Sequence, residues 1–233
     1  MTATATTDAL LAMGIMPAQP PSSQEAQARR VVTARVLSAT ADVAVLRASE
    51  AVGKGFDAVM PRSEFYRDMH WEKGATYLLE QVGAMPRPVL SAVRDEFIEL
   101  LLAGVSPEVR SGAVRVVAVA REPGTRAKIA VAATEPGIDP VAACIGRDAN
   151  RVRFLGRALC GERVDVIAWN PDTETYLRNA LAPASVSELR VSGDQATAFV
   201  PQHQMPAAVG NGGLNSSLAG RLVGINVTIA PVH

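Results

Sequence analysis

Apolar and polar side chains alternate along five short runs near the start of the chain, and glycine, proline or charged residues separate these runs. A period of two is typical of strands that bury one face. The runs are residues 30–39, 43–48, 56–61, 75–82 and 88–93. They predict a small all-β barrel of the OB type, a common nucleic-acid-binding fold, over residues 29–93. An unrelated five-stranded barrel would give the same pattern.

Beyond residue 93 the apolar spacing changes to that of helices mixed with strands. A helix is predicted at 94–105, a hairpin at 113–134 around Pro123-Gly124, helices at 139–146 and 150–161, and a strand at 163–169. The same order then returns, with a helix at 172–183, a hairpin at 187–201, helices at 205–210 and 214–224, and a strand at 226–232. The second half of the chain is therefore predicted to hold two copies of one α+β unit.

Glycines mark equivalent positions in the two copies. Gly146 aligns with Gly210, Gly156-Arg157 with Gly220-Arg221, and Gly161 with Gly224. Two helices joined by a glycine loop and docked on a three-stranded sheet are the KH architecture, whose GXXG loop clamps the phosphates of single-stranded RNA. We therefore predict two type II KH domains, at residues 94–169 and 170–233, packed together through "NALAPASV" (179–186).

Residues 1–28 are rich in Ala, Thr, Pro, Ser and Gln and show no sustained period, which predicts a disordered leader. The leader lacks the basic start of a secretory signal, and no run is long enough to cross a membrane, so we expect a cytoplasmic protein without a membrane partner. The two cysteines, Cys144 and Cys160, lie in apolar surroundings and are expected to be buried thiols.

The balance of charge bears on the kind of partner. The chain has 23 basic and 23 acidic residues, which argues against a strongly electrostatic nucleic-acid binder. The distribution is uneven, however, because residues 113–169 contain nine basic and six acidic side chains. The arginines among these basic residues could bind phosphate, or they could simply form a solvent-exposed charged face of the protein.

Several segments together resemble the bacterial transcription termination and antitermination factor NusA. "AREPGTRAKIAV", "DPVAACIG", "RVRFLGRALCGERVDVIAW" and "NALAPASV" are similar to its first KH domain and the exit from it. "AVMPRSEF" and "VLSAVRDEFIELLLAGVSPEV" resemble the end of its OB barrel, of the ribosomal protein S-one type, and the helix that follows. "PAAVGNGGLNSSLAGRLVG" resembles the second KH loop, so the likeness spans residues 30–231.

This resemblance implies single-stranded RNA, in the form of nascent transcript, as the ligand and a role in transcription elongation, termination or antitermination. It also implies RNA polymerase or other transcription factors as partners. We expect the polymerase-binding domain with which NusA begins to be absent from this chain. A protein-interaction scaffold with little RNA affinity is the competing interpretation.

The two loops depart from the GXXG pattern in different ways. The first, Gly146-Arg147-Asp148-Ala149, ends in alanine and holds an acidic residue, whereas the second, Gly210-Asn211-Gly212-Gly213, has the glycines but no cation. We expect the first loop to bind phosphate more weakly, by about 1–2 kcal/mol. The candidate RNA-binding residues are Gly146, Arg147, Arg151, Arg153, Arg121, Arg126, Lys128, Gly210, Asn211, Gly212, Gly213 and Asn215.

Nothing in the sequence predicts catalysis, a metal site or a cofactor. The three histidines stand apart and none belongs to a nucleophile or metal motif. The aromatic residues of the barrel segment, Phe56, Phe65, Tyr66 and Trp71, could stack on bases, but we expect them to fill the core.

Overall fold

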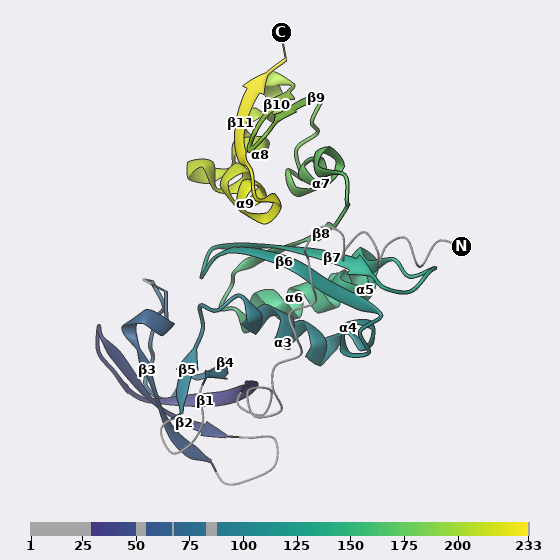
Figure 1. Ribbon diagram of the computed structural model, residues 1–233. Helices are drawn as coiled ribbons and strands as arrows, with labels where there is room; N and C mark the ends of the chain where they lie inside the picture. The colour runs from purple at the N-terminus through teal and green to yellow at the C-terminus, as the bar shows by residue number, and fades with distance from the viewer. Residues whose placement is uncertain (1–28, 50–54, 67, 83–87, 233) are drawn as a thin grey trace.

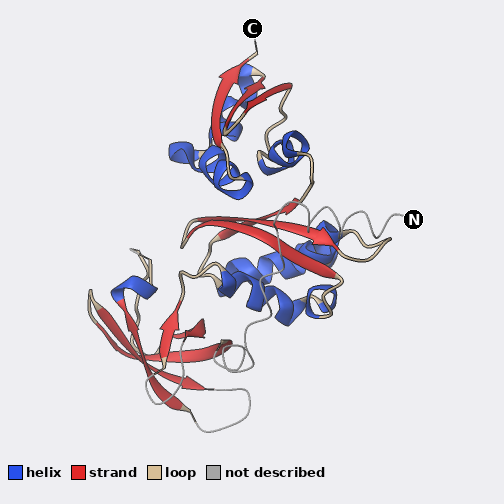
Figure 2. Ribbon diagram, viewed as in Figure 1, coloured by secondary structure: helices blue, strands red, loops and turns tan. Residues whose placement is uncertain are grey.

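The computed structural model describes residues 29–49, 55–66, 68–82 and 88–232 and contains three modules that follow one another along the chain (Figure 1). The expected disordered leader, residues 1–28, lies outside the described residues. A five-stranded barrel comes first, and two α+β modules follow (Figure 2). The expected arrangement of an OB barrel before two KH domains is confirmed.

The barrel closes in the strand order β1-β2-β3-β5-β4. Its strands are β1 (Arg30–Ala39), β2 (Val43–Ser49), β3 (Phe56–Pro61), β4 (Thr76–Val82) and β5 (Val89–Ser91). Alternate residues point inward, so Val32, Ala34 and Val36 of β1 are buried while their neighbours Thr33 and Arg35 are exposed. The alternation that predicted the strands is thus the alternation that fills the core.

The aromatic residues of the barrel pack against its core. Phe56 and Phe65 are buried, and the ring of Trp71 meets the rings of Phe65 and Tyr77 edge to face, with centroids 5.4 Å apart in each pair. Tyr66 is partly buried against the same cluster. The structure therefore favours the core interpretation of these residues over exposed base-stacking platforms.

The first KH domain places its helices on one face of a sheet with strand order β6-β7-β8. Its elements are α3 (Glu96–Val105), α4 (Pro107–Arg110), β6 (Val114–Glu122), β7 (Arg126–Ala133), α5 (Pro140–Ile145), α6 (Asn150–Ala158) and β8 (Arg163–Ala168). Phe97, Ile129 and Leu155 lie in the core between helices and sheet. The short helix α4 was not predicted, because its four residues are too few to show a helical period.

The second KH domain repeats this order, with α8 and α9 in the places of α5 and α6. Its elements are α7 (Thr173–Ala180), β9 (Glu188–Ser192), β10 (Gln195–Val200), α8 (Met205–Val209), α9 (Leu214–Val223) and β11 (Asn226–Pro231). The glycine alignment is confirmed. Gly161 N donates to Gly156 O at 2.7 Å, and Gly224 N donates to Gly220 O at 2.8 Å, where each helix turns toward its last strand.

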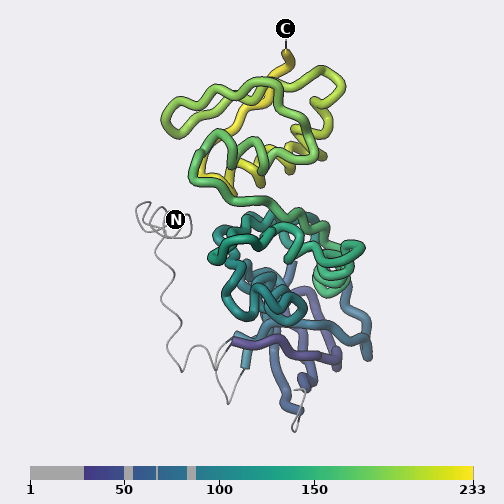
Figure 3. The backbone as a smooth tube through the Cα atoms, turned by 90° about the vertical axis from the view of Figure 1, so that its right-hand side faces the viewer, coloured from purple at the N-terminus to yellow at the C-terminus, as the bar shows by residue number. Residues whose placement is uncertain are grey.

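The two KH domains share a hydrophobic core, and the tube in Figure 3 shows them in direct succession. The face of the first sheet opposite its helices contributes Ala120, Ala130 and Ile167 to this core. Leu177 of α7 and Leu218 of α9 pack against that face from the second domain. Apolar burial on both sides of the first sheet therefore joins the domains. Of the segment 179–186, through which the sequence predicted this packing, Ala180 and Leu181 lie in the shared core, whose other buried residues come from α7, α9 and the two sheets.

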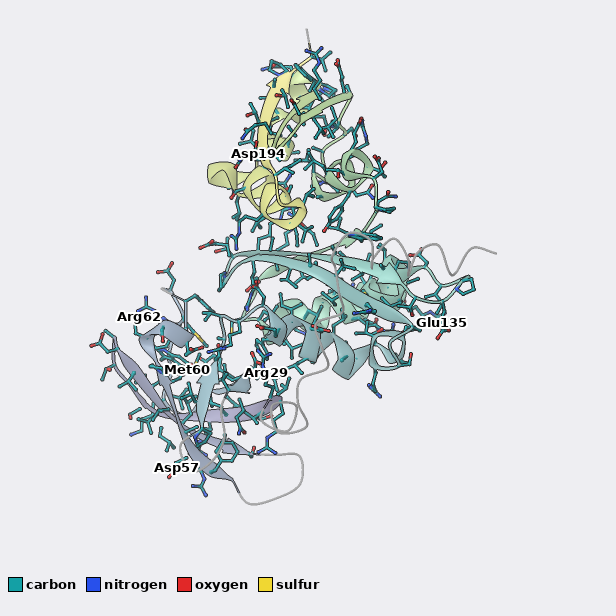
Figure 4. All side chains as sticks on the ribbon, in the orientation of Figure 1. Arg29, Asp57, Met60, Arg62, Glu135 and Asp194 are labelled. Carbon is teal, nitrogen blue, oxygen red and sulfur yellow. The ribbon has the colours of Figure 1, made fainter. Side chains whose placement is uncertain are left out.

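An ion-pair network and apolar contacts join the barrel to the first KH domain. Arg29, labelled in Figure 4, lies between them and pairs with Glu80 of β4 at 3.1 Å and Glu96 of α3 at 3.2 Å. Glu80 is fully buried, and this burial raises its carboxyl pKa. No helix in the described ranges is long and apolar enough to span a bilayer.

Candidate RNA interface

The loop of the first KH domain joins α5 to α6 through a tight turn at Gly146 and a 3-10 turn (Arg147–Ala149). Gly146 has φ +75°, and a Cβ there would lie 2.6 Å from Cγ of Arg151, so the position requires glycine. Asp148 and Ala149 follow with φ +50° and +57°, in the left-handed region that L residues enter at a cost. The first loop therefore keeps the tight turn at its first glycine, but non-glycine residues occupy its last two positions.

The loop of the second KH domain has the same backbone shape. Gly210 has φ +75° and ψ 172°, against +75° and 168° at Gly146, and Gly212 and Gly213 also have positive φ. Open space surrounds the Cβ positions of Gly212 and Gly213. This loop is free of side-chain bulk on the side where α9 begins, and the first backbone N–H groups of a helix favour an anion there.

Three arginines at and after the first loop are exposed. They are Arg147 in the loop and Arg153 and Arg157 one turn apart on α6. Within the described ranges, the guanidinium groups of these three residues have no hydrogen-bond or ion-pair partner. Arg147 and Arg153 were predicted. Arg157 was not, although its spacing of four residues from Arg153 was a readable signal.

Arg151 and Asn215, both predicted to bind RNA, instead point into the protein. Arg151 Nη1 donates to Ala143 O and, at 2.9 Å, to Glu108 Oε2. Asn215 is fully buried, and its Nδ2 donates to Ala208 O at 3.0 Å. Each side chain thus ties the helix after its loop to a carbonyl near the end of the helix before it. In this arrangement both support the loops from beneath.

The charged residues of the β6–β7 hairpin also differ from their expected exposed placement. Arg121 is buried and donates to both oxygens of Glu162, at 2.7 and 2.9 Å. Lys128 is 0% exposed, and Arg126 Nε donates to Asp165 Oδ2 at 2.7 Å. Arg121 lies beside the barrel residues Tyr66 and Met69, and Lys128 Nζ donates to Ala182 O of the second KH domain, so neighbouring modules help to bury these two side chains. Arg121, Arg126 and Lys128 are therefore engaged within the protein and are not part of the proposed RNA surface.

A groove of about 240 Å³ runs along β8, which is the edge strand of the first sheet. Ile145 and Val152 line it from the two loop-bearing helices, and Ala182 and Pro183 line it from the segment after α7. Arg163, with 64% of its side chain exposed, stands at the rim. Sequence reasoning missed this groove, because strands and loops distant in the chain form it.

The backbone of β8 offers hydrogen bonds to an occupant of the groove. Arg163 N donates to Thr125 O and Trp169 N to Val131 O, so the odd-numbered residues of β8 pair with β7. The N–H and C=O groups of Val164 and Val166 therefore point away from the sheet at its open edge. An apolar groove beside free backbone donors and acceptors suits a flat base with polar edges.

Side chains of the kinds that ligate metals and both thiols also lie among the described residues. No group of three His, Cys, Asp or Glu side chains there could hold a metal ion. Cys144 is buried, and burial raises its thiol pKa to about 11. Cys160, also expected to be buried, is instead exposed, at a turn with φ +57°.

Comparison with known proteins identifies both domains. Residues 93–169 match the NusA-like first KH domain family, and residues 173–232 match the NusA-like second KH domain family. The chain is also similar to proteins named transcription termination/antitermination protein NusA. That of Thermus thermophilus is 36% identical over 76% of this chain and 47% of the relative, and that of Halalkalibacterium halodurans is 33% identical over 74% and 47%.

A third relative, NusA of Mycobacterium tuberculosis, is 35% identical over 76% of this chain and 53% of its own length. The chain thus spans about half the length of the curated relatives that it matches. The two KH matches follow one another in the order that the structure shows. This chain is therefore a NusA-like protein that carries both KH domains in tandem.

Proposed function

We propose that this chain binds single-stranded RNA along its two KH domains, with phosphates at the two glycine loops and bases in the groove beside β8. The observation that carries the proposal is the matching backbone of the loops at Gly146 and Gly210, each placed at the start of a helix. The groove along β8 lies next to the first of these loops and supplies apolar walls for bases.

The two domains contribute different parts of the binding. The first has the cations Arg147, Arg153 and Arg157 but a loop that ends in Asp148 and Ala149. The second has the more open loop, Gly210–Gly213, and no cation within it. An RNA strand across both domains gains the charge of one and the backbone clamp of the other, and two linked weak sites bind more tightly than either alone.

We infer further that the RNA is nascent transcript and that the protein acts in transcription elongation, termination or antitermination. The names of its relatives support this role. The proposed protein partners are RNA polymerase or other transcription factors. We place the protein in the cytoplasm and propose that it binds RNA without catalysing a reaction. A pull-down of RNA polymerase core, with and without RNA, tests the protein partner.

The test of RNA binding is a titration of labelled single-stranded RNA at two salt concentrations. Asn211→Asp with Gly212→Asp places two anions in the second loop, and the backbone accepts them because Asp148 already occupies the place equivalent to Gly212. We expect the affinity to fall about tenfold or more. Unchanged affinity in a variant that remains folded at the temperature of the titration would contradict the proposal.

A matched control adds the same charge elsewhere on the second domain. Ser192→Asp with Gln195→Asp changes two exposed residues at the β9–β10 turn. We expect this variant to keep the affinity of the unmodified protein within about twofold, because long-range repulsion between exposed charges is screened by salt. An equal loss in both variants would mean that net charge, and not the loop, controls binding.

A further inference from the structure

The segment Leu181–Pro183, which leads from α7 toward the second sheet, is held by both KH domains at once. Leu181 O accepts a hydrogen bond from Asn215 Nδ2 at 3.1 Å. The next carbonyl, Ala182 O, accepts one from Lys128 Nζ at 3.0 Å. Lys128 belongs to β7 of the first domain, and Asn215 to the first turn of α9 in the second. Two adjacent peptide groups are therefore fixed from opposite sides.

Both donors are fully buried, with 0% of each residue exposed. A buried ammonium is costly unless it is paired and hydrogen-bonded, and Lys128 Nζ also lies 3.3 Å from Asp165 Oδ2. Asn215 Nδ2 makes its second hydrogen bond to Ala208 O, near the end of α8. Because alternative arrangements would leave these groups without partners, the contacts specify one placement of the segment.

Each donor is in direct contact with one part of the proposed RNA surface. On the first domain, Asp165, the partner of Lys128, lines the groove together with Ala182 and Pro183. On the second domain, Asn215 lies directly against the loop, since a Cβ on Gly210 would be 2.7 Å from Asn215 N. A continuous chain of contacts therefore connects the groove to the second loop.

We propose that Lys128 and Asn215 are positioning residues that fix the distance between the groove of the first KH domain and the loop of the second. In this role they set the length of RNA that can occupy both sites, without touching the RNA themselves. The inference rests on the proposed function and adds to it the means by which the two sites are spaced. Spacing matters because the gain from linking two sites is lost when the geometry does not fit.

The experiment compares two RNA lengths. One RNA has about four nucleotides, enough for one KH domain, and the other has about ten, enough for both. Lys128→Met and Asn215→Ala each remove one of the two links. Thr134→Val is the matched control, because it removes a single side-chain hydrogen bond, from Thr134 Oγ1 to Gly112 O at 2.8 Å, in the first domain.

We expect Lys128→Met to bind the short RNA within about twofold of the unmodified protein and the long RNA about fivefold or more weakly. Asn215→Ala also removes the hydrogen bond to Ala208 O that supports the second loop, so we expect it to weaken binding of both RNAs, with the larger loss for the long one. The control variant keeps both affinities. An equal loss for both lengths, with a salt dependence reduced by about one phosphate contact, would show direct RNA contact and overturn the proposal. Unchanged binding of the long RNA would overturn it as well.

A second measurement needs no RNA and separates this inference from the proposed function. Spin labels on Ser111→Cys and Ser192→Cys, in a Cys160→Ser background, report the distance between the two domains. We expect a narrow distribution in the unmodified and Thr134→Val proteins and a broader one in Lys128→Met and Asn215→Ala. An unbroadened distribution overturns the positioning role, whereas a broadened one in a protein that binds neither RNA supports that role and contradicts only the proposed function.

Discussion

Asp148 and Gly212 have the same left-handed backbone conformation at equivalent positions of the two loops. Their φ and ψ angles are 50° and 31° for Asp148 and 59° and 24° for Gly212. An L residue adopts this conformation at a cost of about 1–2 kcal/mol, whereas glycine adopts it freely. The next position repeats the contrast, with Ala149 in the first loop and Gly213 in the second. The first loop thus keeps its shape against its local preference.

Ala149→Gly should stabilise the protein. Removal of the methyl group relieves the left-handed strain of about 1–2 kcal/mol, and the greater entropy of glycine in the unfolded chain offsets about 0.5–1 kcal/mol of that gain. We expect the free energy of unfolding to rise by about 0.5–1 kcal/mol, measured as a higher urea midpoint by circular dichroism.

The same exchange in a helix provides the control for this prediction. Ala142 lies exposed in α5, where Ala142→Gly should lower the free energy of unfolding by about 0.5–1 kcal/mol. A fall in both variants would mean that Ala149 is not strained.

Glu162→Gln should destabilise the protein strongly. The side chains of Arg121 and Glu162 are 1% and 0% exposed, and Gly124 N also donates to Glu162 Oε2 at 2.9 Å. The substitution leaves the guanidinium charge buried without a counter-charge, which costs about 3–5 kcal/mol. Thermal unfolding measures the loss.

An exposed ion pair of the same type gives the comparison. Arg190 Nε and Glu188 Oε1 are 2.6 Å apart, and the two side chains are 68% and 53% exposed. Glu188→Gln should change the free energy of unfolding by less than about 1 kcal/mol. Equal effects of the two substitutions would refute the claim that burial makes the Arg121–Glu162 pair important.

The fold could be predicted because local sequence patterns indicate its helices, strands and loops. Alternation marks the barrel strands, and the repeated glycines mark both loops, since positive φ at Gly146 and Gly210 is a requirement of the backbone itself. The burial of Arg121 and Lys128 could not be predicted, because it depends on contacts with Arg94, in the segment that leads out of the barrel, and with Ala182 of the second KH domain. Local sequence carries no signal for contacts between distant modules.

For the candidate site, too, only the features that depend on local structure could be predicted. The exposed residues Arg147 and Arg153 lie where a loop and the start of a helix put them, and their exposure follows from local structure. Arg151 and Asn215 also have polar side chains and lie in the first turn of the helix after each loop, yet contacts with Ala143 and Leu181 turn them inward. Residue type and spacing identify a candidate surface, but packing decides which of its polar groups remain free.

Lys128 should make stability depend on pH above neutrality. Burial lowers its pKa to about 8, although Asp165 opposes the shift, and Arg126 and Arg163 act in the same direction as burial. Between this value and the ordinary pKa of about 10.4, the unfolded chain binds more protons than the folded chain, so the Lys128 contribution to stability rises with pH.

We therefore expect the melting temperature of the unmodified protein, minus that of Lys128→Met, to increase from pH 7.5 to pH 10. The difference removes the pH-dependent contributions to stability of titratable groups that both proteins share, such as Tyr66. A difference that stays flat or falls over this range would contradict a lowered pKa at Lys128.

Arg153→Ala and Arg157→Ala should each weaken RNA binding without affecting the fold. Both side chains are exposed on the same face of α6. Loss of one phosphate contact makes the negative slope of log K against log salt shallower by about 0.7 for a single strand. Arg115→Ala, an exposed arginine on β6, is the control and should leave the slope unchanged. Because exposed side chains contribute little to stability, all three melting temperatures should agree. Equal slopes in all three variants would remove α6 from the path of the RNA.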